Sequence, residues 1–428
     1  MTVQEEKNLA LEGIRKKLVG RSLSYKEIYA IMDEIAKERL GDVLTTYFVA
    51  SGYSKGFSND EIYYLTKAMI ETGEQLEFKG IVADKHSIGG SPGTRTTLLV
   101  VPIIAAAGFT IPKSSSRAIT TPAGTADSME TLAKVTFTKE EIYKIVEKTN
   151  GCIVWGGSFK IAPADDDIIR IEEPLLFESF DKILVSIMAK KIAFGSNHVV
   201  IDLPYGSSMK VRRREDAEVL GKKFEYIASR FHIKIKVIIH RIDEPASRGV
   251  GPLLEAREAL KVLEQTEDRS HDLEKKSIEL CSILLSLCLE DASPTLKKQV
   301  SETYVDTKQW AHDILVSGKA LAKMREIIKA QKGNPDVSSK TLVLDSHKKE
   351  VKYEHASGKI TKINNKNLTV IAKLLGAPHN HKAGIYMHKM LDETVHKGDT
   401  LYTFYSNSSY NIQEAQDSLH LFPIIEVE

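Results

Sequence analysis

The order of the apolar segments between residues 79 and 243 constrains the fold more than any other feature of this sequence. Five of these segments are short, rich in β-branched residues, and bounded by glycine, proline or polar residues. They are KGIVAD (79–84), GFTIPK (108–113), NGCIVWGG (150–157), NHVVIDLPYG (197–206) and HIKIKVIIHRID (232–243). Amphipathic stretches of helical length lie between them, among them 178–195 and 214–231. Strands that alternate with helices predict a mainly parallel sheet, which binds ligands outside the carboxyl ends of its strands.

The regions on either side have other patterns. Residues 1–75 and 252–331 carry apolar residues at helical spacing. From about residue 340, short apolar segments joined by polar turns predict strands, for example TLVLDS (341–346) and DTLYTFYS (399–406), with one helix at NLTVIAKLLG. Because 428 residues are more than one core usually holds, we expect several domains.

The predicted fold is therefore a multidomain protein of the α/β and α+β classes. A small all-helical domain takes residues 1–80, with a returning helical segment at about 172–195. A larger α/β domain with a mainly parallel sheet takes residues 81–171 and 196–335. A C-terminal α+β domain takes residues 340–428.

The charge balance argues against one class of partner. The chain has 59 Lys and Arg against 58 Asp and Glu, for a formal net charge of +1. No general field for a polyanion follows from this balance, so we expect no nucleic-acid partner and only local anion sites. The densest basic cluster, KVRRRE (210–215), is followed by acidic residues and is typical of a solvated helix start.

The cysteines and the first residues indicate the compartment. Cys152, Cys281 and Cys288 have neither the spacing of a zinc site nor that of a disulfide framework. The first residues, MTVQEEKNLALEGIRKK, are charged and lack the apolar core of a signal peptide. No apolar run approaches the roughly 20 residues that a membrane helix needs. We therefore expect a cytoplasmic protein with no membrane partner.

Two hydroxyl-rich segments follow predicted strands and precede predicted helices. The first is DKHSIGGSPGTRTT (84–97), and the second is IPKSSSRAITTPAGTADSME (111–130). Glycine lets the backbone approach a ligand closely, and a helix that begins at the hydroxyls aims its free N–H groups at the same point. Together the segments predict one pocket for an anion, with phosphate as its ligand. A solvated turn capped by threonine is the alternative, and neither segment is a Walker loop or a G-x-G-x-x-G loop.

Together with VWGGSFKIAPADD, SIMAKKIA and VGPLLEAREAL, these segments closely resemble the thymidine phosphorylase family. The SSRAIT and PAGTAD patterns are most similar to its AMP phosphorylase branch, whereas typical thymidine phosphorylases carry a more glycine-rich loop there. The resemblance runs in collinear order from about residue 10 to about residue 425. The AMP phosphorylase branch usually has an additional N-terminal domain, which we expect this chain to lack.

The resemblance implies phosphorolysis of an N-glycosidic bond, in which inorganic phosphate attacks C1′ of a ribose and the base departs. It implies AMP as the substrate and adenine and ribose 1,5-bisphosphate as the products. Such chemistry needs an anchored nucleophile, an acid for the base and the exclusion of water. Inorganic phosphate is the co-substrate, and no metal or other cofactor is expected. The resemblance also implies a homodimer through the N-terminal helices and hinges near 79–84 and 152–157.

The binding positions of the family carry over onto this sequence in three groups. The nucleotide-binding group is Gly90, Ser116, Arg117, Ala118, Ile119, Thr120, Thr121, Thr125, Ser186 and Lys210. The phosphate-binding group is Lys85, Ser87, Thr97, Ser115 and Thr125. The base-recognition group is Arg170, Ser186 and Lys190, with a shift of one residue between Arg170 and Ser186.

The resemblance places the catalytic acid at Glu178, where the AMP phosphorylase branch has an aspartate. Asp181 lies about one helical turn further on and is the competing candidate, and a plain charged helix start is the alternative for both. His86 is expected either to polarise a carbonyl of the base or only to order its loop. Lys210 is expected to contact a 5′-phosphate, with a solvated loop lysine as the alternative.

Three other functions remain open. The first is a nucleoside phosphorylase that acts on thymidine or uridine. The second is a phosphoribosyltransferase of the kind related to anthranilate synthesis, although the sequence has no GTGGD-like loop. The third is a ligand-binding relative without catalysis, which the retained Lys85, Ser87, Arg117 and Ser186 disfavour.

Overall fold

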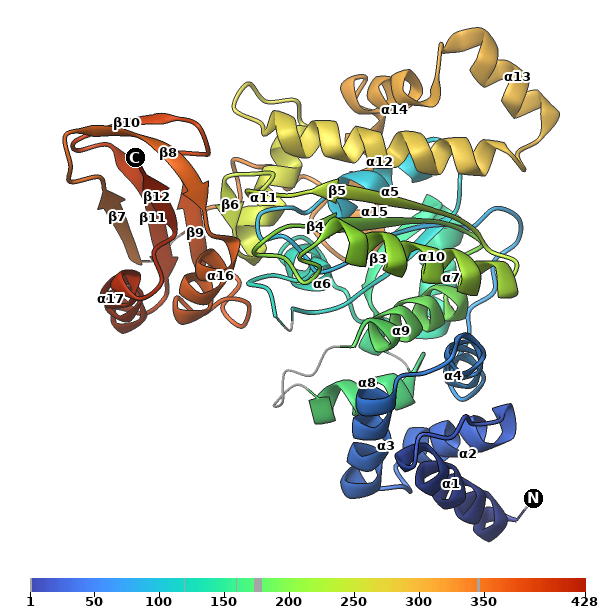
Figure 1. Cartoon of the computed structure of the whole chain (residues 1–428). Helices are drawn as coiled ribbons and strands as arrows, with labels where there is room; N and C mark the ends of the chain where they lie inside the picture. The colour runs from blue at the N-terminus through green and yellow to red at the C-terminus, as the bar shows by residue number, and fades with distance from the viewer. Residues whose placement is uncertain (1, 119, 159, 173–178, 345–346) are drawn as a thin grey trace.

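The computed structural model describes residues 2–118, 120–158, 160–172, 179–344 and 347–428. Figure 1 shows N-terminal helices at the bottom, a layered α/β region at the upper right and a smaller region with many strands at the left. The predicted fold class is confirmed, because a helical part, a part with parallel strands and a part with antiparallel strands are all present. The boundaries between the domains stay predictions.

Capping side chains set where three of the N-terminal helices begin. Thr2, Ser24 and Ser58 each accept a hydrogen bond from the backbone N–H three residues on, and the glutamate there accepts one from the cap N–H. The first helices are α1 (Val3–Leu18), α2 (Tyr25–Ala36), α3 (Asp42–Lys55) and α4 (Asn59–Glu71). Two later helices, α8 (Pro163–Glu172) and α9 (Phe180–Ala193), pack against them and share their apolar core.

Two sets of parallel strands form the central layer. The strands are β1 (Ala83–Ser87), β2 (Ile111–Ser115), β3 (Gly151–Trp155), β4 (His198–Tyr205) and β5 (Lys234–Arg241). β4 lies between β1 and β5, and β2 pairs with β3. A parallel bridge between Val82 and Thr110 joins the two sets. β1 and β2 are therefore neighbours, and Ser87 and Ser115 end them at the same edge.

β1 lies later in the chain than the sequence pattern predicted. The pattern predicts a strand at 79–84 and a loop after it, whereas Asp84, Lys85 and Ser87 belong to the strand itself. The reason is that Asp84 and Lys85 are buried through ion pairs with other elements, so polar side chains occupy an interior strand.

Helices cover both faces of the sheet (Figure 1). α12 packs on β1, β4 and β5, and α10 packs on β4 and β5 from the other face. α5 is apolar on all sides and packs among α12, α14 and α15. The helices of this region are α5 (Thr97–Ala106), α6 (Thr125–Glu130), α7 (Lys139–Thr149), α10 (Arg214–Arg230), α11 (Pro252–Leu263), α12 (His271–Leu289), α13 (Pro294–Thr303), α14 (Thr307–Val316) and α15 (Lys319–Ala330). None of the helices in the described ranges is both long and apolar enough to span a bilayer.

The C-terminal region holds antiparallel strands. β11 lies between β7 and β9, β9 also pairs with β6, and β8 pairs with β10 and β12. The elements are β6 (Gly249–Val250), β7 (His347–Lys352), β8 (Ser357–Ile363), α16 (Asn365–Leu374), β9 (Gly384–Met387), β10 (Thr394–His396), β11 (Thr400–Ser406), α17 (Ser409–Asp417) and β12 (Ile425–Val427). The strand predicted at 341–346 is wrong for residues 341–344, because Leu342 is buried in the α/β core instead.

Candidate active site

The two hydroxyl-rich segments meet through Arg95 of the first segment. Its guanidinium donates to the Thr125 hydroxyl at 3.3 Å and to the Ala123 carbonyl at 2.8 Å, both in the second segment. Glu255 on α11 accepts from Nε of Arg95 at 2.7 Å and from the Gly93 N–H at 3.2 Å. Because Arg95 and Glu255 are both buried, this ion pair fixes the two segments to α11.

Lys85 is the middle residue of β1 and is buried, and its ammonium contacts Ser87 at the carboxyl end of the strand. Its ammonium donates to the Thr96 hydroxyl at 2.6 Å and to the Ser87 hydroxyl. Asp202 on β4 accepts from Ser87 at 2.5 Å and lies 3.9 Å from the ammonium. Burial lowers the pKa of Lys85 to about 8, although Asp202 opposes this shift. The ammonium is therefore incompletely compensated, and it sits among hydroxyl groups that suit a phosphate.

Ser115, at the carboxyl end of β2, is buried, and its hydroxyl oxygen has no hydrogen-bond partner within the described ranges. A buried hydroxyl without a partner costs free energy, which a hydrogen bond to a phosphate oxygen would recover. Thr97 and Thr125 stand at the first positions of α5 and α6, which follow the two segments. Gly124 allows the second segment to fold back, because a Cβ there would lie 2.5 Å from the Ser116 carbonyl oxygen.

The other residues predicted to bind a nucleotide lie around these groups. Gly90 packs on Thr121, whose methyl group would lie 3.1 Å from a Cβ at Gly90. The Lys210 side chain lies beside Gly89, so it reaches the first segment from the end of β4. Ile119 falls outside the described residues. Several of these nucleotide-binding candidates keep part of their surface in solvent, namely Ser116, Arg117, Ala118, Thr120, Thr121 and Thr125.

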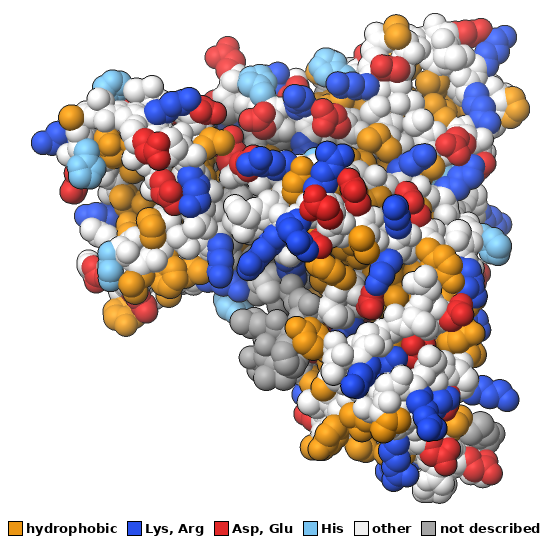
Figure 2. All heavy atoms as spheres, in the orientation of Figure 1, with side chains coloured by type: hydrophobic (Ala, Val, Ile, Leu, Met, Phe, Trp, Pro, Cys, Tyr) orange, Lys and Arg blue, Asp and Glu red, His pale blue; other side chains and the backbone are white. Residues whose placement is uncertain are grey.

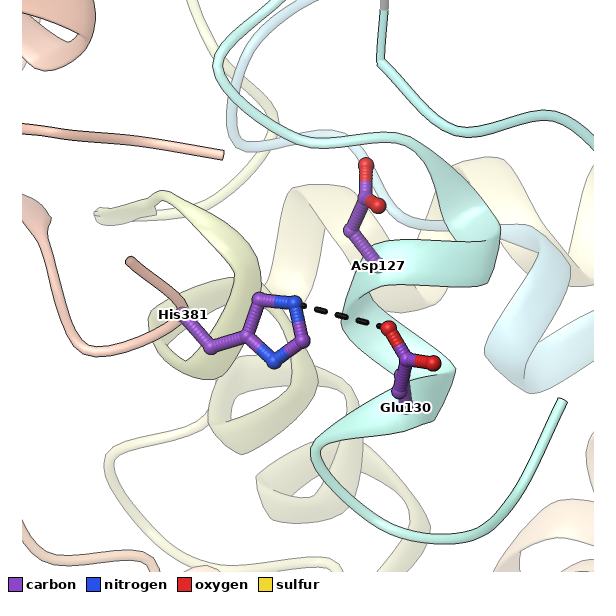
Figure 3. A group of neighbouring side chains, drawn as sticks. All are labelled: Asp127, Glu130 and His381. Carbon is purple, nitrogen blue, oxygen red and sulfur yellow. Dashed lines mark ion pairs between the residues drawn. The ribbon is translucent and has the colours of Figure 1, made fainter. Parts of the chain in front are cut away.

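Arg117 is held by two carboxylates of α6. It donates to Glu130 at 2.5 and 2.8 Å and to Asp127 at 3.2 Å, and its guanidinium lies over the Trp155 ring. Figure 3 shows His381, from the C-terminal region, pointing its ring at Glu130, with Nε2 3.6 Å from Oε2. The ligand atoms of Asp127, Glu130 and His381 are close enough for one metal ion. Because Arg117 already compensates both carboxylates, the arrangement favours a clamp on Arg117.

Two buried aspartates are each shared by two lysines. A carboxylate oxygen of Asp84 lies 3.5 Å from the ammonium of Lys113, and the other lies 2.5 Å from that of Lys191. Asp202 lies 3.9 Å from the Lys85 ammonium and 3.6 Å from the Lys276 ammonium. Burial lowers the pKa of Lys113 well below its usual value, and Lys191 lowers it further. Four amines thus face two carboxylates, so the site favours an anion. Figure 2 shows further Lys and Arg side chains along the hollow between the C-terminal region and the helices.

His86 stands among these lysines on β1. Burial lowers the pKa of His86 well below its usual range, and Lys191, Lys113 and Lys85 lower it further. The imidazole is therefore neutral at physiological pH, with one nitrogen that donates and one that accepts. Such a ring can donate to a carbonyl of a ligand without adding positive charge.

The residues predicted to recognise a base are only partly brought together. Ser186 and Lys190 on α9 contact the same oxygen of Asp165, at 2.7 and 2.6 Å. Arg170 on α8 is separate, because its side chain is 56% exposed and donates to Asp42 on α3 at 2.7 and 3.1 Å. That surface ion pair raises the pKa of Arg170.

Asp181 is the candidate acid that lies within the described residues. Glu178 lies outside the described residues. Asp181, in the first turn of α9, accepts from Lys223 on α10 at 2.5 Å. This carboxylate is therefore engaged in an ion pair with Lys223.

The sequence analysis did not identify the buried charged residues that hold the site residues in place through ion pairs. Arg95, Glu255, Asp84 and Asp202 were not singled out, although each lies in a segment that the sequence analysis quoted. Asp202 had the clearest signal, because a carboxylate in the apolar segment NHVVIDLPYG needs a buried partner. The identity of that partner could not be read from the sequence.

Three descriptions of protein domains match the chain. The helical bundle domain of a glycosyl transferase family matches residues 11–73, and the a/b domain of that family matches residues 79–321. The C-terminal domain of pyrimidine nucleoside phosphorylases matches residues 359–421.

Similar proteins cover nearly the whole chain. The AMP phosphorylase of Methanocaldococcus jannaschii is 42% identical over 99% of this chain and 82% of its own length, and that of Thermofilum pendens is 44% identical over 95% and 76%. A putative thymidine phosphorylase of Legionella pneumophila (strain Paris) is 39% identical over 96% and 76%.

Among solved structures, the anthranilate phosphoribosyltransferase of Thermus thermophilus has a TM-score of 0.61 at 16% identity. The match covers 75% of this chain and 99% of that chain, and it shows a shared fold. The chain therefore belongs to this glycosyl transferase family, in the group of the thymidine and AMP phosphorylases, and is a pentosyltransferase.

Proposed function

We propose that this enzyme phosphorolyses AMP and releases adenine and ribose 1,5-bisphosphate. The AMP phosphorylases that resemble it over nearly its whole length support this substrate. One structural observation carries the proposal: a buried surplus of lysines lies beside Ser87 and Ser115, at the ends of two adjacent parallel strands. Inorganic phosphate has the charge and the acceptor oxygens that suit such a site.

In this proposal the strand ends bind the nucleophile. A phosphate oxygen attacks C1′ of the ribose, the C–N bond breaks, and its electron pair leaves with the base. Holding the phosphate in line with C1′ turns a bimolecular reaction into a nearly intramolecular one. The residues that would hold it are Lys85, Ser87, Thr97, Ser115 and Thr125.

The other end of the site would serve the base and the 5′-phosphate. Adenine is a poor leaving group unless a ring nitrogen is protonated, and we assign that proton to Glu178. A neutral His86 would hydrogen-bond to the substrate without adding charge. Lys210, beside the first segment, would pair with the 5′-phosphate, and Ser186 and Lys190 would contact the base.

We also propose that the enzyme needs no cofactor besides inorganic phosphate and works as a homodimer in the cytoplasm. Three unpaired, buried cysteines are in keeping with a reducing compartment.

Apolar side chains on the surface of α1 and α3 are in keeping with a dimer; they are Val3, Leu18, Val43, Tyr47 and Tyr53. Light scattering that gives a monomer at micromolar concentration would contradict the dimer.

Incubation of the purified protein with AMP tests the proposed reaction. We expect adenine and a ribose bisphosphate only when phosphate is present, at a rate that EDTA does not change. Equal release of adenine without phosphate would identify a hydrolase instead. Loss of activity in EDTA that Mg²⁺ restores would contradict the cofactor proposal.

The second candidate is a pyrimidine nucleoside phosphorylase. A relative with the name putative thymidine phosphorylase and the pairing of Ser186 with Lys190 through Asp165 favour it. A pyrimidine can leave as an anion, so this reaction would not need Glu178 as an acid. A higher kcat/KM for thymidine or uridine than for AMP would establish it.

A further inference from the structure

Asp202 is a buried carboxylate whose two oxygens face different groups. Its Oδ2 accepts from the Ser87 hydroxyl at 2.5 Å and lies 3.9 Å from the Lys85 ammonium. Its Oδ1 lies 3.4 Å from Nδ1 of His240 and 3.6 Å from the Lys276 ammonium. One oxygen therefore faces two proposed phosphate ligands, and the other faces two residues outside the proposed site.

Lys276 and His240 connect this carboxylate with the surface. Nζ of Lys276 lies 2.6 Å from Nε2 of His240, and their side chains are 16% and 29% exposed, against 1% for Asp202. Two ammonium groups thus share one carboxylate. A one-to-one ion pair would leave Lys85 neutralised, whereas a shared carboxylate leaves positive charge buried and uncompensated, which is unfavourable until an anion enters.

We propose that Asp202 and Lys276 are positioning residues of the phosphate site, an inference that rests on the proposed function. Asp202 aligns the Ser87 hydroxyl and the Lys85 ammonium at the end of β1. Lys276, from α12, pairs with the same carboxylate, so Asp202 does not fully neutralise the Lys85 ammonium. The remaining positive charge on Lys85 can pair with phosphate. Both residues act through Lys85 and Ser87, without contact to the phosphate itself.

Several elements direct charged groups at Lys85. They are Asp84 and His86 on β1, Arg95 after β1, Lys113 on β2, Asp202 on β4 and Lys276 on α12, with His240 and Glu279 beside Lys276. Burial lowers the pKa of Lys85 to about 8, Asp202 and Asp84 raise it, and Lys276 and Arg95 lower it further. Only the ammonium form attracts an anion, so anion binding weakens as the pH rises through about 8.

Calorimetric titration of the full-length protein with inorganic phosphate tests the proposal at a series of pH values. A parallel titration with sulfate, whose charge stays constant over this range, separates the titration of Lys85 from that of phosphate. In Asp202→Asn the lost carboxylate lowers the pKa of Lys85, so the midpoint of the loss of binding moves down by about one pH unit. In Lys276→Met a like charge is lost, so the midpoint moves up.

Lys275→Met is the matched control, because Lys275 is the exposed neighbour of Lys276 on α12, and its midpoint stays that of the wild type. Opposite shifts in the two variants support the proposal, because a merely structural role would not separate their signs. If circular dichroism shows that Asp202→Asn does not fold, Lys276→Met decides alone, and an unchanged or lowered midpoint overturns the proposal. Because no nucleotide is present, this failure is distinct from an absence of AMP phosphorolysis by the wild type, which overturns the proposed function.

Discussion

The phosphate end and the base end of the candidate site are built differently. The residues proposed to bind phosphate lie at the ends of β1 and β2 or in the loops and helix starts that follow, and ion pairs with the interior hold them. The residues proposed to recognise a base lie on α8 and α9, and one of them, Arg170, is bound to Asp42 at the surface. The sheet therefore preorganises the phosphate end, whereas we expect the base end to depend on how the helical region closes against it.

Lys191 shows where the two ends are joined. It neighbours Lys190 on α9, and it is buried against Asp84 of β1 at 2.5 Å. The last turns of α9 are thus tied to the sheet by a buried ion pair, which is costly to break. We expect the movement that completes the base end to come from α8 and the N-terminal helices, with this ion pair retained.

The largest effect is expected at the phosphate end. Lys85→Met keeps the length of the side chain but removes the charge, and we expect kcat/KM for phosphate to fall by about 10²–10³-fold. Lys190→Met is the matched variant at the base end, and we expect it to raise KM for the nucleotide instead. Steady-state kinetics with each substrate varied in turn check both. Equal effects of the two variants on both Michaelis constants would remove the distinction between the ends.

A smaller effect is expected for the acid. Glu178→Gln keeps the size of the side chain and removes the proton, so we expect turnover of AMP to fall by about 10²-fold. Asp181→Asn is its control, because Asp181 is already paired with Lys223, and we expect turnover within about threefold of the wild type. The rate of adenine release at saturating substrates is the measurement. A larger loss in Asp181→Asn than in Glu178→Gln would transfer the role to Asp181.

Lys210 is expected to discriminate between nucleotide and nucleoside. Lys210→Ala should raise KM for AMP by about tenfold to a hundredfold, because a hydrogen-bonded charge pair with the 5′-phosphate is lost. KM for adenosine should change little, since adenosine carries no such charge. Parallel kinetics with the two substrates check this. A similar rise in KM for AMP and for adenosine would contradict a contact between Lys210 and the 5′-phosphate.

The smallest effect is expected from the C-terminal region. His381→Ala removes the imidazole beside Glu130, which in turn holds Arg117, so we expect KM for the nucleotide to rise about two- to fivefold. KM for phosphate should stay unchanged. His379→Ala, at an exposed position of the same loop, is the control and should match the wild type. A change in KM for phosphate alone would show that the C-terminal region acts on the phosphate end of the site.

Local patterns made much of the fold predictable. Short apolar segments that alternate with amphipathic ones predicted the parallel strands. The two hydroxyl-rich segments were predicted to converge, and the contacts of Arg95 with Thr125 and Ala123 bring them together, whereas their role as a phosphate site stays a prediction. The pattern misplaced β1 and expected a strand at 341–344, where the burial of Asp84, Lys85 and Leu342 against distant residues decided the outcome.

The sequence by itself determined the parallel α/β architecture and the family, because both depend on patterns of neighbouring residues, and it predicted an anion pocket after β1 and β2. Only the tertiary structure decided which charges share a carboxylate. Ser87 and Asp202 are 115 residues apart, and Asp84 and Lys191 are 107 apart. The energy of a buried charge depends on every neighbour that the fold brings within a few ångströms and on the water that it excludes. The electrostatics of the phosphate end are therefore a property of the packed interior.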